Sequence, residues 1–340
     1  MIRIVNLNTW VGVLPRGLLG EIVAIEPPGH KQKRMDALVD ELVELEPDVI
    51  TFQECLPLPT FAQHIARQLD YDVFFRVANG GLRIGGVGYP PGVGGGEGLA
   101  ILAKKEHRMV LLGAKKLSGT GLVTNWLSLQ LGPVRYALAA KLLVRGEPLI
   151  VATSHIRYGF PSRDAFEAGW VDLHRRGIAR SPIPPRWLHD MTRTHGDARD
   201  KEIKRLAEWL LDLRAKNQGA PVMLGADMNL DPDTPQLADF LAYTGYRNTL
   251  SDEHPGILTW DPRHNANISY SVDFKWPDGK EKSTILQMMA YLDAIPQTPD
   301  HVMLSPGLVC KKSTRVFDRP HGDVFASDHY GICVDAERTP

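Results

Sequence analysis

Short apolar segments recur from one end of the chain to the other, and any fold of this chain has to bury them. Each is rich in Val, Ile or Leu and is bounded by polar or turn-forming residues, a pattern typical of buried β-strands. They lie at Ile2–Leu7, Asp48–Gln53, Leu99–Leu102, Leu149–Thr153, Pro221–Gly225, His301–Leu304 and Tyr330–Val334. The sequence therefore predicts strands that are spread over the whole chain.

Helical patterns lie between these segments. Apolar side chains spaced by three and four residues share one face of an α-helix. Two such sets occur, at Met35, Leu38, Val39, Leu42 and Val43, and at Ile203, Leu206, Ala207, Leu210 and Leu211. Pro47 predicts the end of the first helix. Since strands and helices interleave, we expect a layered α/β fold.

The length of 340 residues suits two average domains or one large α/β enzyme. No internal repeat and no linker rich in Pro, Gly or Ser divides the chain, so we predict a single catalytic domain over residues 1–340. Hydrophobic residues make up 43% of the chain, enough for a large core. The net charge of -1 provides no overall attraction for polyanions, so binding of nucleic acid would need a local basic patch.

The three cysteines, Cys55, Cys310 and Cys333, form no closely spaced pair. Such a small, odd set argues against a disulfide framework and against a cysteine-based zinc site, and it favours the reducing cytoplasm. The N-terminus begins directly with a strand-like segment rather than with a basic and apolar leader. No apolar run approaches the roughly 18 residues of a membrane span. We therefore expect a cytoplasmic protein without a transmembrane segment.

Polar residues stand at the ends of the predicted strands. Four of them end or follow a strand, and three come just before one: Asn8, Glu54, His155 and Asp227, then Asp300, Asp328 and His329. In a mixed sheet, the start of one strand lies beside the end of its antiparallel neighbour. All these side chains can therefore gather on one rim, where a catalytic site on a rigid scaffold is expected.

Several of these residues have a chemical role that fits their position. The Glu54 carboxylate is a hard oxygen ligand for a divalent cation, although a strand-end glutamate can also be merely solvated. Asp227 and Asn229 lie two residues apart at a strand exit. The carboxylate could orient or deprotonate a water and the amide could donate to a phosphoryl oxygen. The alternative is an Asx turn that ends the strand.

The segment Ser327-Asp328-His329 supplies a general acid or base in His329 and a further metal-binding carboxylate in Asp328. Asp300 could orient the imidazole, as in other pairs of a base and an orienting carboxylate. The alternative is a turn with a surface histidine. His155 is a candidate for a phosphate contact, and a structural histidine is its alternative.

The order of these residues along the chain resembles the endonuclease/exonuclease/phosphatase superfamily. Its metal-dependent phosphoesterases include deoxyribonucleases, AP endonucleases, inositol polyphosphate phosphatases and neutral sphingomyelinases. The resemblance runs from Ile2 to about Val334. It implies a four-layer α/β sandwich in which helices flank two central mixed β-sheets.

The resemblance also implies a role for each matching residue. Glu54 resembles the family's principal magnesium ligand, with Asn8 beside it. Asp227 and Asn229 resemble the pair that handles the water and the phosphate, and His155 resembles the phosphate-contacting histidine. Asp300 and His329 resemble the carboxylate–imidazole dyad, and Asp328 resembles the carboxylate that precedes this histidine. The chain departs from the family at Thr298-Pro299-Asp300-His301, where the family often has Arg-Ile-Asp-Tyr. Asp293 is therefore an alternative to Asp300.

The predicted ligands indicate the metal and, less directly, the substrate. Oxygen donors without cysteine favour Mg²⁺, with Mn²⁺ or Ca²⁺ as alternatives. The segments 6–10, 31–35 and 226–230 look most like the neutral sphingomyelinase branch. That branch implies cleavage of a phosphodiester to release phosphocholine and ceramide. We expect in-line attack by a water that Asp227 positions and whose proton His329, oriented by Asp300, takes or relays.

The segment 157–205 is the predicted specificity insertion. It holds 11 Arg or Lys against 7 Asp or Glu, together with Phe160, Phe166, Trp170 and Trp187. Such aromatics can lie at a bilayer interface, stack on the bases of nucleic acid, or pack inward. The glycine-rich segment Gly80–Gly98 is predicted to be a surface loop, either a plain flexible loop or a second wall of the site.

Three functions remain compatible with the sequence. They are a phospholipid phosphodiesterase, a nuclease or other phosphodiesterase, and a catalytically inactive binding module. The complete set of predicted ligands argues against the third function, because an inactive site has no physical reason to keep metal-binding carboxylates. Steep dependence of binding on salt would favour a nuclease.

Overall fold

A computed structural model describes residues 1–16, 21–84, 87–89, 96–130, 133–158, 163–179, 181–275 and 284–339. Two six-stranded sheets face each other at its centre. The first sheet has the order β17 (Leu308–Val316), β18 (Gly331–Arg338), β1 (Ile2–Asn8), β4 (Val49–Cys55), β8 (Glu97–Lys104) and β5 (Tyr71–Asn79). The second has the order β15 (Arg247–Asn248), β16 (Asp300–Leu304), β14 (Val222–Asp227), β13 (Glu147–His155), β12 (Arg135–Val144) and β9 (Val110–Ser118).

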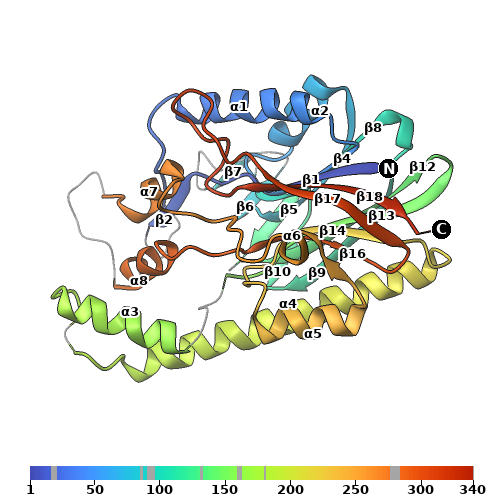
Figure 1. Ribbon diagram of the computed structural model, residues 1–340. Helices are drawn as coiled ribbons and strands as arrows, with labels where there is room; N and C mark the ends of the chain where they lie inside the picture. Colours follow the sequence, from blue (N-terminus) through green and yellow to red (C-terminus); the bar gives the residue numbers. More distant parts are fainter. Residues whose placement is uncertain are drawn as a thin grey trace.

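Helices cover the outer face of each sheet (Figure 1). The first sheet carries α1 (His30–Leu45) and α2 (Thr60–Leu69), and the second carries α4 (Arg186–Lys216) and α5 (Pro235–Thr244). One buried apolar cluster fills the space between the sheets and beneath α1 and α2, and another fills the space beneath α4 and α5. The four-layer α/β sandwich with two mixed central sheets is therefore confirmed.

The predicted strands and helices are present at the expected places. Each of the apolar segments found in the sequence contributes to a strand of one of the two large sheets. The first amphipathic pattern is α1, which ends at Leu45 because Glu46 adopts a left-handed conformation with φ of 47°, one residue before Pro47. The second pattern lies within α4, which is long enough to run beneath most of the second sheet.

Smaller elements complete the described chain. A small sheet has the order β10 (Gly121–Val123), β11 (Leu127–Gln130), β6 (Leu82–Ile84) and β7 (Val87–Tyr89), and β2 (Val13–Arg16) pairs with β3 (Glu21–Ala24). The helices α3 (Arg163–Arg175), α7 (Ala266–Val272) and α8 (Thr284–Asp293) lie at the end of the molecule away from both termini (Figure 1). The short helix α6 (Thr249–Glu253) follows β15. No helix among the described residues is long and apolar enough to cross a membrane.

Two expectations about loops need correction or restriction. The segment Gly80–Gly98 is not one surface loop, because β6, β7 and the start of β8 lie within it. The backbone of β6 pairs with β11, which outweighs the low strand propensity of the nearby glycines. Residues 85–86 and 90–95 of this segment lie outside the described residues.

The segment 157–205 contains α3 and more than half of α4, so its predicted boundary at Arg205 falls inside a continuous helix. Phe166 and Trp170 are buried against Leu173, Leu188 and Met288 in a cluster of their own. These two aromatics therefore pack inward, and neither a lipid surface nor a base can reach them. Phe160 and the side chain of Trp187 lie outside what the structure describes.

Candidate active site

The strand ends of both sheets meet where the sequence predicted a shared rim. Asn8 ends β1 in the first sheet, and its Nδ2 donates to Oδ2 of Asp227 at the end of β14 in the second sheet, at 2.9 Å. His155 ends β13, and its Nε2 lies 3.5 Å from Asp227 Oδ2 and 3.9 Å from Oε1 of Glu54. Four of the predicted residues thus form one cluster that bridges the two sheets.

The antiparallel pairing of β14 with β16 brings Asp300 to this cluster, because Asp227 and Asp300 are register partners. Oδ2 of Asp300 accepts a hydrogen bond from Nδ1 of His329 at 2.8 Å. One donor atom each from Asp227, Asp300 and His329 lie within 4.8 Å of one another. Asp293 ends α8 instead, where its backbone carbonyl accepts a bond from Trp260 Nε1 at 2.7 Å. The geometry thus joins Asp300, and not Asp293, to His329.

Asn229 forms the Asx turn that was one of the two alternatives its sequence position left open. Its backbone N–H donates to Asp227 Oδ1 at 3.0 Å and its φ is 50°, so the residues form an Asx-type turn. Its side-chain Nδ2 donates one hydrogen bond to the carbonyl of Ile156 at 2.9 Å. The turn therefore fixes the Asp227 carboxylate and holds the Asn229 amide against the end of β13, beside His155.

The segment that carries His329 is held by buried asparagines that the sequence analysis did not identify. Asn265 Nδ2 donates to the carbonyls of Ser327 at 3.0 Å and Asp328 at 2.9 Å, and Asn267 Nδ2 donates to the Ser327 carbonyl at 3.0 Å. Ser327 Oγ donates to the carbonyl of Asn8 at 2.6 Å, which ties the segment to β1. These contacts join residues about 60 or more positions apart, and the sequence contains no pattern that connects them.

An aromatic ring and a further carboxylate were also missed. The Trp260 ring lies edge-on to the His329 imidazole, with 4.8 Å between the ring centroids and an interplanar angle of 69°. Glu97 begins β8, and after burial it is the strongest electrostatic influence that raises the pKa of Glu54. Glu97 lies within the glycine-rich segment Gly80–Gly98, where the many glycines predicted a loop and masked the single acid.

Burial gives the site unusual protonation behaviour. Burial raises the pKa values of Glu54, Asp227 and Asp328 to about 7, and neighbouring carboxylates add to the effect. Burial would lower the pKa of His329, but the adjacent Asp300 carboxylate outweighs this effect and raises the pKa well above its ordinary value. For His155, burial lowers the pKa well below the ordinary value. His329 is therefore favoured as an imidazolium and His155 as a neutral imidazole.

The donor set fits a hard divalent cation. Asn8, Glu54 and Asp328 offer oxygen atoms, and after burial the Glu54 carboxylate helps to raise the pKa of Asp328. A cation relieves that repulsion directly. The closest trio of acidic and histidine donors at the rim is instead Asp227, Asp300 and His329. Because Asp300 and His329 bond to each other, this trio has the geometry of an acid–base dyad next to a carboxylate.

A close approach of the two sheets supports the rim from below. A Cβ atom on Gly225 would lie 2.2 Å from Thr51 Oγ1 and 2.7 Å from Asn6 Oδ1, so only glycine fits between the sheets. Gln53 Nε2 bridges them by donating to Asn6 Oδ1 and to Thr153 Oγ1, each at 2.8 Å. This buried polar layer lies just before the strand ends that carry the site, and it fixes the separation of those strands.

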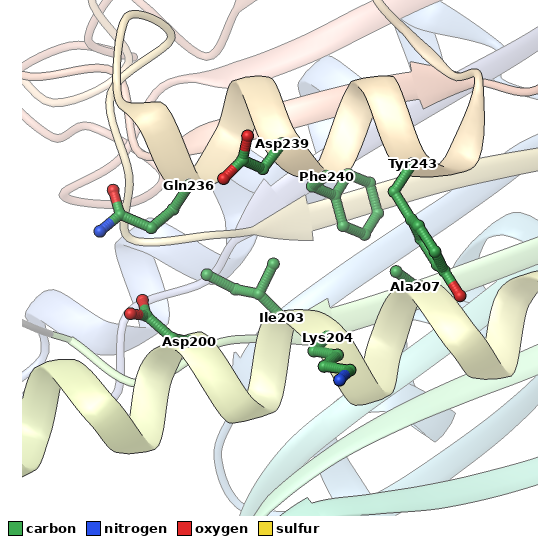
Figure 2. A pocket seen from close by; sticks show the side chains of 8 residues that line it. All are labelled: Asp200, Ile203, Lys204, Ala207, Gln236, Asp239, Phe240 and Tyr243. Carbon is green, nitrogen blue, oxygen red and sulfur yellow. The ribbon is translucent and has the colours of Figure 1, made fainter.

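A groove elsewhere on the molecule contains none of the predicted site residues. It lies between α4 and α5, where Ile203 and Ala207 face Phe240 and Tyr243 and polar side chains stand at the margins (Figure 2). Its residues pack the two outer helices together. The groove is therefore separate from the rim where the acids and histidines gather.

Comparison with known proteins gives one sequence match and many structural ones. The family model described as "Endonuclease/Exonuclease/phosphatase family" matches residues 5–329. No curated protein sequence matches the chain.

Three solved structures illustrate the shared fold. A humanized form of D. rerio TDP2 is 15% identical, with a TM-score of 0.56 and coverage of 99% of both chains. A mannosyl-6-phosphatase of Bacteroides thetaiotaomicron is 13% identical, with a TM-score of 0.57 and coverage of 99% of this chain and 100% of that one. The human Nocturnin catalytic domain with a bound sulfate anion is 15% identical, with a TM-score of 0.56 and coverage of 99% and 94%.

Proposed function

The chain belongs to the Endonuclease/Exonuclease/phosphatase family, and from this premise we propose that it hydrolyses phosphoester bonds with the help of a divalent metal. The observation that supports this proposal is that acids, an asparagine and a histidine from both sheets are in contact at the rim. Asn8 from one sheet bonds to Asp227 from the other, and the Asp300–His329 dyad lies within reach of the same carboxylate. Packing alone would not require acids and histidines from both sheets to converge at one buried place.

In this proposal the metal is Mg²⁺, with Mn²⁺ as an alternative, and Glu54, Asn8 and Asp328 hold it. Oxygen donors of this kind suit these hard cations. The bound metal would act as a Lewis acid that stabilises negative charge on the phosphate.

The residues of the chain carry the proton transfers. Asp227, whose pKa burial raises to about 7, is suited to accept the proton of the attacking water as its oxygen bonds to phosphorus. The His329 imidazolium is suited to donate its Nε2 proton to the leaving oxygen as the phosphorus–oxygen bond breaks. Nδ1 remains bonded to Asp300 throughout. The transfer at His329 thus runs opposite to the one expected from the sequence, because Asp300 favours the protonated ring.

The remaining predicted residues position the phosphate. His155 is buried as a neutral ring beside Asp227, and one N–H of the Asn229 amide is fixed on the Ile156 carbonyl. We assign both to contacts with phosphoryl oxygens. Loss of one such donor commonly raises a reaction barrier by about 2.7–4 kcal/mol.

For the substrate we propose the phosphodiester of a phospholipid, as in a sphingomyelinase-like enzyme. The support is the resemblance of residues 6–10, 31–35 and 226–230 to that branch of the family. The second candidate is nucleic acid. It is supported by a structure of D. rerio TDP2, 15% identical to this chain, that holds a single-stranded DNA product.

A panel of substrates with Mg²⁺ tests the proposal. It contains sphingomyelin, lysophospholipids, single- and double-stranded DNA, RNA, inositol phosphates and a soluble diester, bis(p-nitrophenyl) phosphate, each with an EDTA control. A His329→Ala variant is expected to lose about 10²–10⁴-fold in turnover on whichever substrate reacts. His64→Ala on α2, which covers the outer face of the first sheet, is the matched control. Near wild-type turnover of His329→Ala would reject the role of this residue, and activity that survives EDTA would reject the metal.

A further inference from the structure

In the small sheet β10–β11–β6–β7, polar side chains point inward and most apolar side chains point outward. Among its described side chains, Arg83, Val123 and Ser128 point inward and are almost completely buried. The next residues along the same strands, which point outward, are all aliphatic. Leu82, Ile84, Leu122 and Leu129 are each between 49% and 64% exposed. An antiparallel sheet with one solvated face normally shows the opposite arrangement, with polar side chains outside.

The outward side chains are neighbours across the strands. Leu122 pairs with Leu129, Leu129 pairs with Leu82, and Leu127 pairs with Ile84. Residues that face each other across strands lie on the same side of a sheet, so these leucines and the isoleucine form one continuous surface. Trp126 stands at the turn between β10 and β11 and is 64% exposed. We call this surface, formed by Leu82, Ile84, Leu122, Trp126 and Leu129, the leucine face.

Specific bonds hold the inverted arrangement in place. Arg83 Nη2 donates to the carbonyls of Thr124 and Asn125, each at 2.9 Å. Ser128 Oγ donates to the carbonyl of Gly81 at 2.8 Å. Because Arg83 Nη2 and Ser128 Oγ find carbonyl partners on the inner side, turning the strands over would break these bonds. The apolar side chains are thus kept outside by the structure.

The strands of the small sheet and the adjacent strand β9 carry charge of only one sign. They contain no Asp or Glu, whereas they contain the buried Arg83 on β6 and the two lysines Lys115 and Lys116 on β9. Lys116 lies at the edge of the sheet and donates from Nζ to the Gly121 carbonyl at 3.0 Å. An occupant of the face therefore has to combine an apolar interior with negative charge.

The small sheet also adjoins the catalytic rim. Gln130 at the end of β11 donates from Nε2 to Asn79 Oδ1 at 2.8 Å, and Asn79 in turn donates to Glu97. Glu97 lies close enough to Glu54 to raise its pKa. A surface that sits against the leucine face would consequently lie beside the site.

We propose that the leucine face docks the protein on a lipid bilayer that contains anionic lipids. Leucine, isoleucine and tryptophan side chains enter the boundary between head groups and acyl chains, and lysine and arginine attract the anionic head groups. A second copy of the chain would offer an apolar face too, but it would bring the same basic segments and repel. Nucleic acid would supply negative charge, but its phosphate backbone offers aliphatic side chains little to bury against.

The test measures binding of the full chain to vesicles by co-sedimentation, in EDTA so that no bond is hydrolysed. The vesicles contain phosphatidylcholine alone or phosphatidylcholine with phosphatidylserine. The protein is expected to bind the second kind more tightly. The double variant Leu82→Thr/Leu129→Thr removes two paired leucines and keeps residues that favour strands. Its partition onto the vesicles should fall by at least about tenfold, since burial of one leucine contributes roughly that factor.

Val43→Thr on α1 is the matched control, because it removes an apolar side chain of similar exposure from another surface. It should bind as the unchanged protein does. Failure of the unchanged protein to bind either vesicle, or equal binding by the double variant, would overturn the proposal. So would a concentration-dependent dimer that the double variant abolishes, since this would assign the face to a second copy.

The inference deepens the proposed phospholipid hydrolysis but can fail separately from it. Hydrolysis of bis(p-nitrophenyl) phosphate reports on the site without a bilayer, and the double variant should retain it together with its unfolding temperature. Vesicle binding without hydrolysis of any substrate would reject the proposed function and keep the docking face. Hydrolysis of the soluble diester without vesicle binding would keep the proposed hydrolysis and reject the docking face.

Discussion

Replacing Gly225 by alanine should destabilise the protein by forcing the two sheets apart. The new Cβ would stand 2.2 Å from Thr51 Oγ1 and 2.7 Å from Asn6 Oδ1, so one or both polar side chains must move. Overpacking of this kind costs about 1–3 kcal/mol. Thr51 donates to Asn6 at 2.8 Å, and breaking this buried bond adds about 1–2 kcal/mol. The expected loss is therefore about 2–5 kcal/mol.

This loss converts into a measurable shift of the unfolding temperature. With an unfolding entropy of about 2.1 cal/mol/K per residue, a chain of 340 residues changes by about 0.7 kcal/mol for each degree. The transition should thus fall by roughly 3–7 °C in a calorimetric scan. Gly196→Ala in α4 is the matched control, because a Cβ there meets nothing within 4 Å and alanine favours a helix. It should leave the temperature unchanged or raise it slightly.

A double variant locates the cause. Thr51→Ala removes the atom nearest to the new Cβ, so Gly225→Ala should cost less in that background than in the unchanged protein. An unfolding temperature for Gly225→Ala equal to that of Gly196→Ala would show that the sheets do not approach so closely, and it would refute the reasoning. Strict additivity with Thr51→Ala would place the damage elsewhere.

Further outcomes follow from the charged groups. Asp300→Asn should reduce turnover of bis(p-nitrophenyl) phosphate by about 10²–10⁴-fold, because His329 loses its bonded partner and the carboxylate that raises its pKa most; unchanged turnover would show that the dyad is not used. Glu54→Gln should raise the Mg²⁺ concentration needed for half-maximal activity, and an unshifted titration would remove Glu54 from the metal site. Burial alone would raise the pKa of Asp48, but hydrogen bonds to its carboxylate, including one from Lys104, hold it well below the ordinary value. Asp48→Asn should therefore cost about 1–3 kcal/mol in urea unfolding at neutral pH, and the difference should shrink progressively as the pH falls below the ordinary value near 4 toward the lower pKa of the folded state; a constant difference would contradict it.

The rim was predictable because strand direction and strand ends are local properties. The sequence places Asp227 at the end of an apolar segment and Asp300 at the start of another. Antiparallel pairing then makes the two residues partners, as the register of β14 with β16 shows. The same reasoning brings His329, just before β18, to the end of β1. Sequence position thus determined the neighbourhood of the acids without any knowledge of the loops.

The supports of the rim were not predictable, because they join segments that no local pattern relates. Asn265 lies directly before the short helix α7 and Asn267 lies within its first turn, where asparagine is ordinarily interpreted as a cap. Asn265 does accept a cap bond through its Oδ1, yet its Nδ2 holds the carbonyls of Ser327 and Asp328. Likewise, periodicity found the apolar face of α4 but could not indicate where this long helix begins. Tertiary contacts determine both features.

The leucine face was missed for a different reason. Its strands are only three or four residues long and stand among glycines, so their alternation is too brief to identify a strand from the sequence. Even with the strands known, a pattern of alternating apolar residues would have assigned the leucines to the core and Arg83 to solvent. The structure reverses this assignment because Arg83 finds its carbonyl partners on the inner side.

The rim and the leucine face depart in opposite ways from what stability alone would select. The rim buries Glu54, Asp227 and Asp328, whose ionisation burial opposes, whereas the small sheet exposes leucines that burial would favour. A sequence tends to break the rules of folding where function requires it. A cation would compensate the first departure and a bilayer would compensate the second. Because Gln130, Asn79 and Glu97 join the two places, one membrane-bound orientation would serve both.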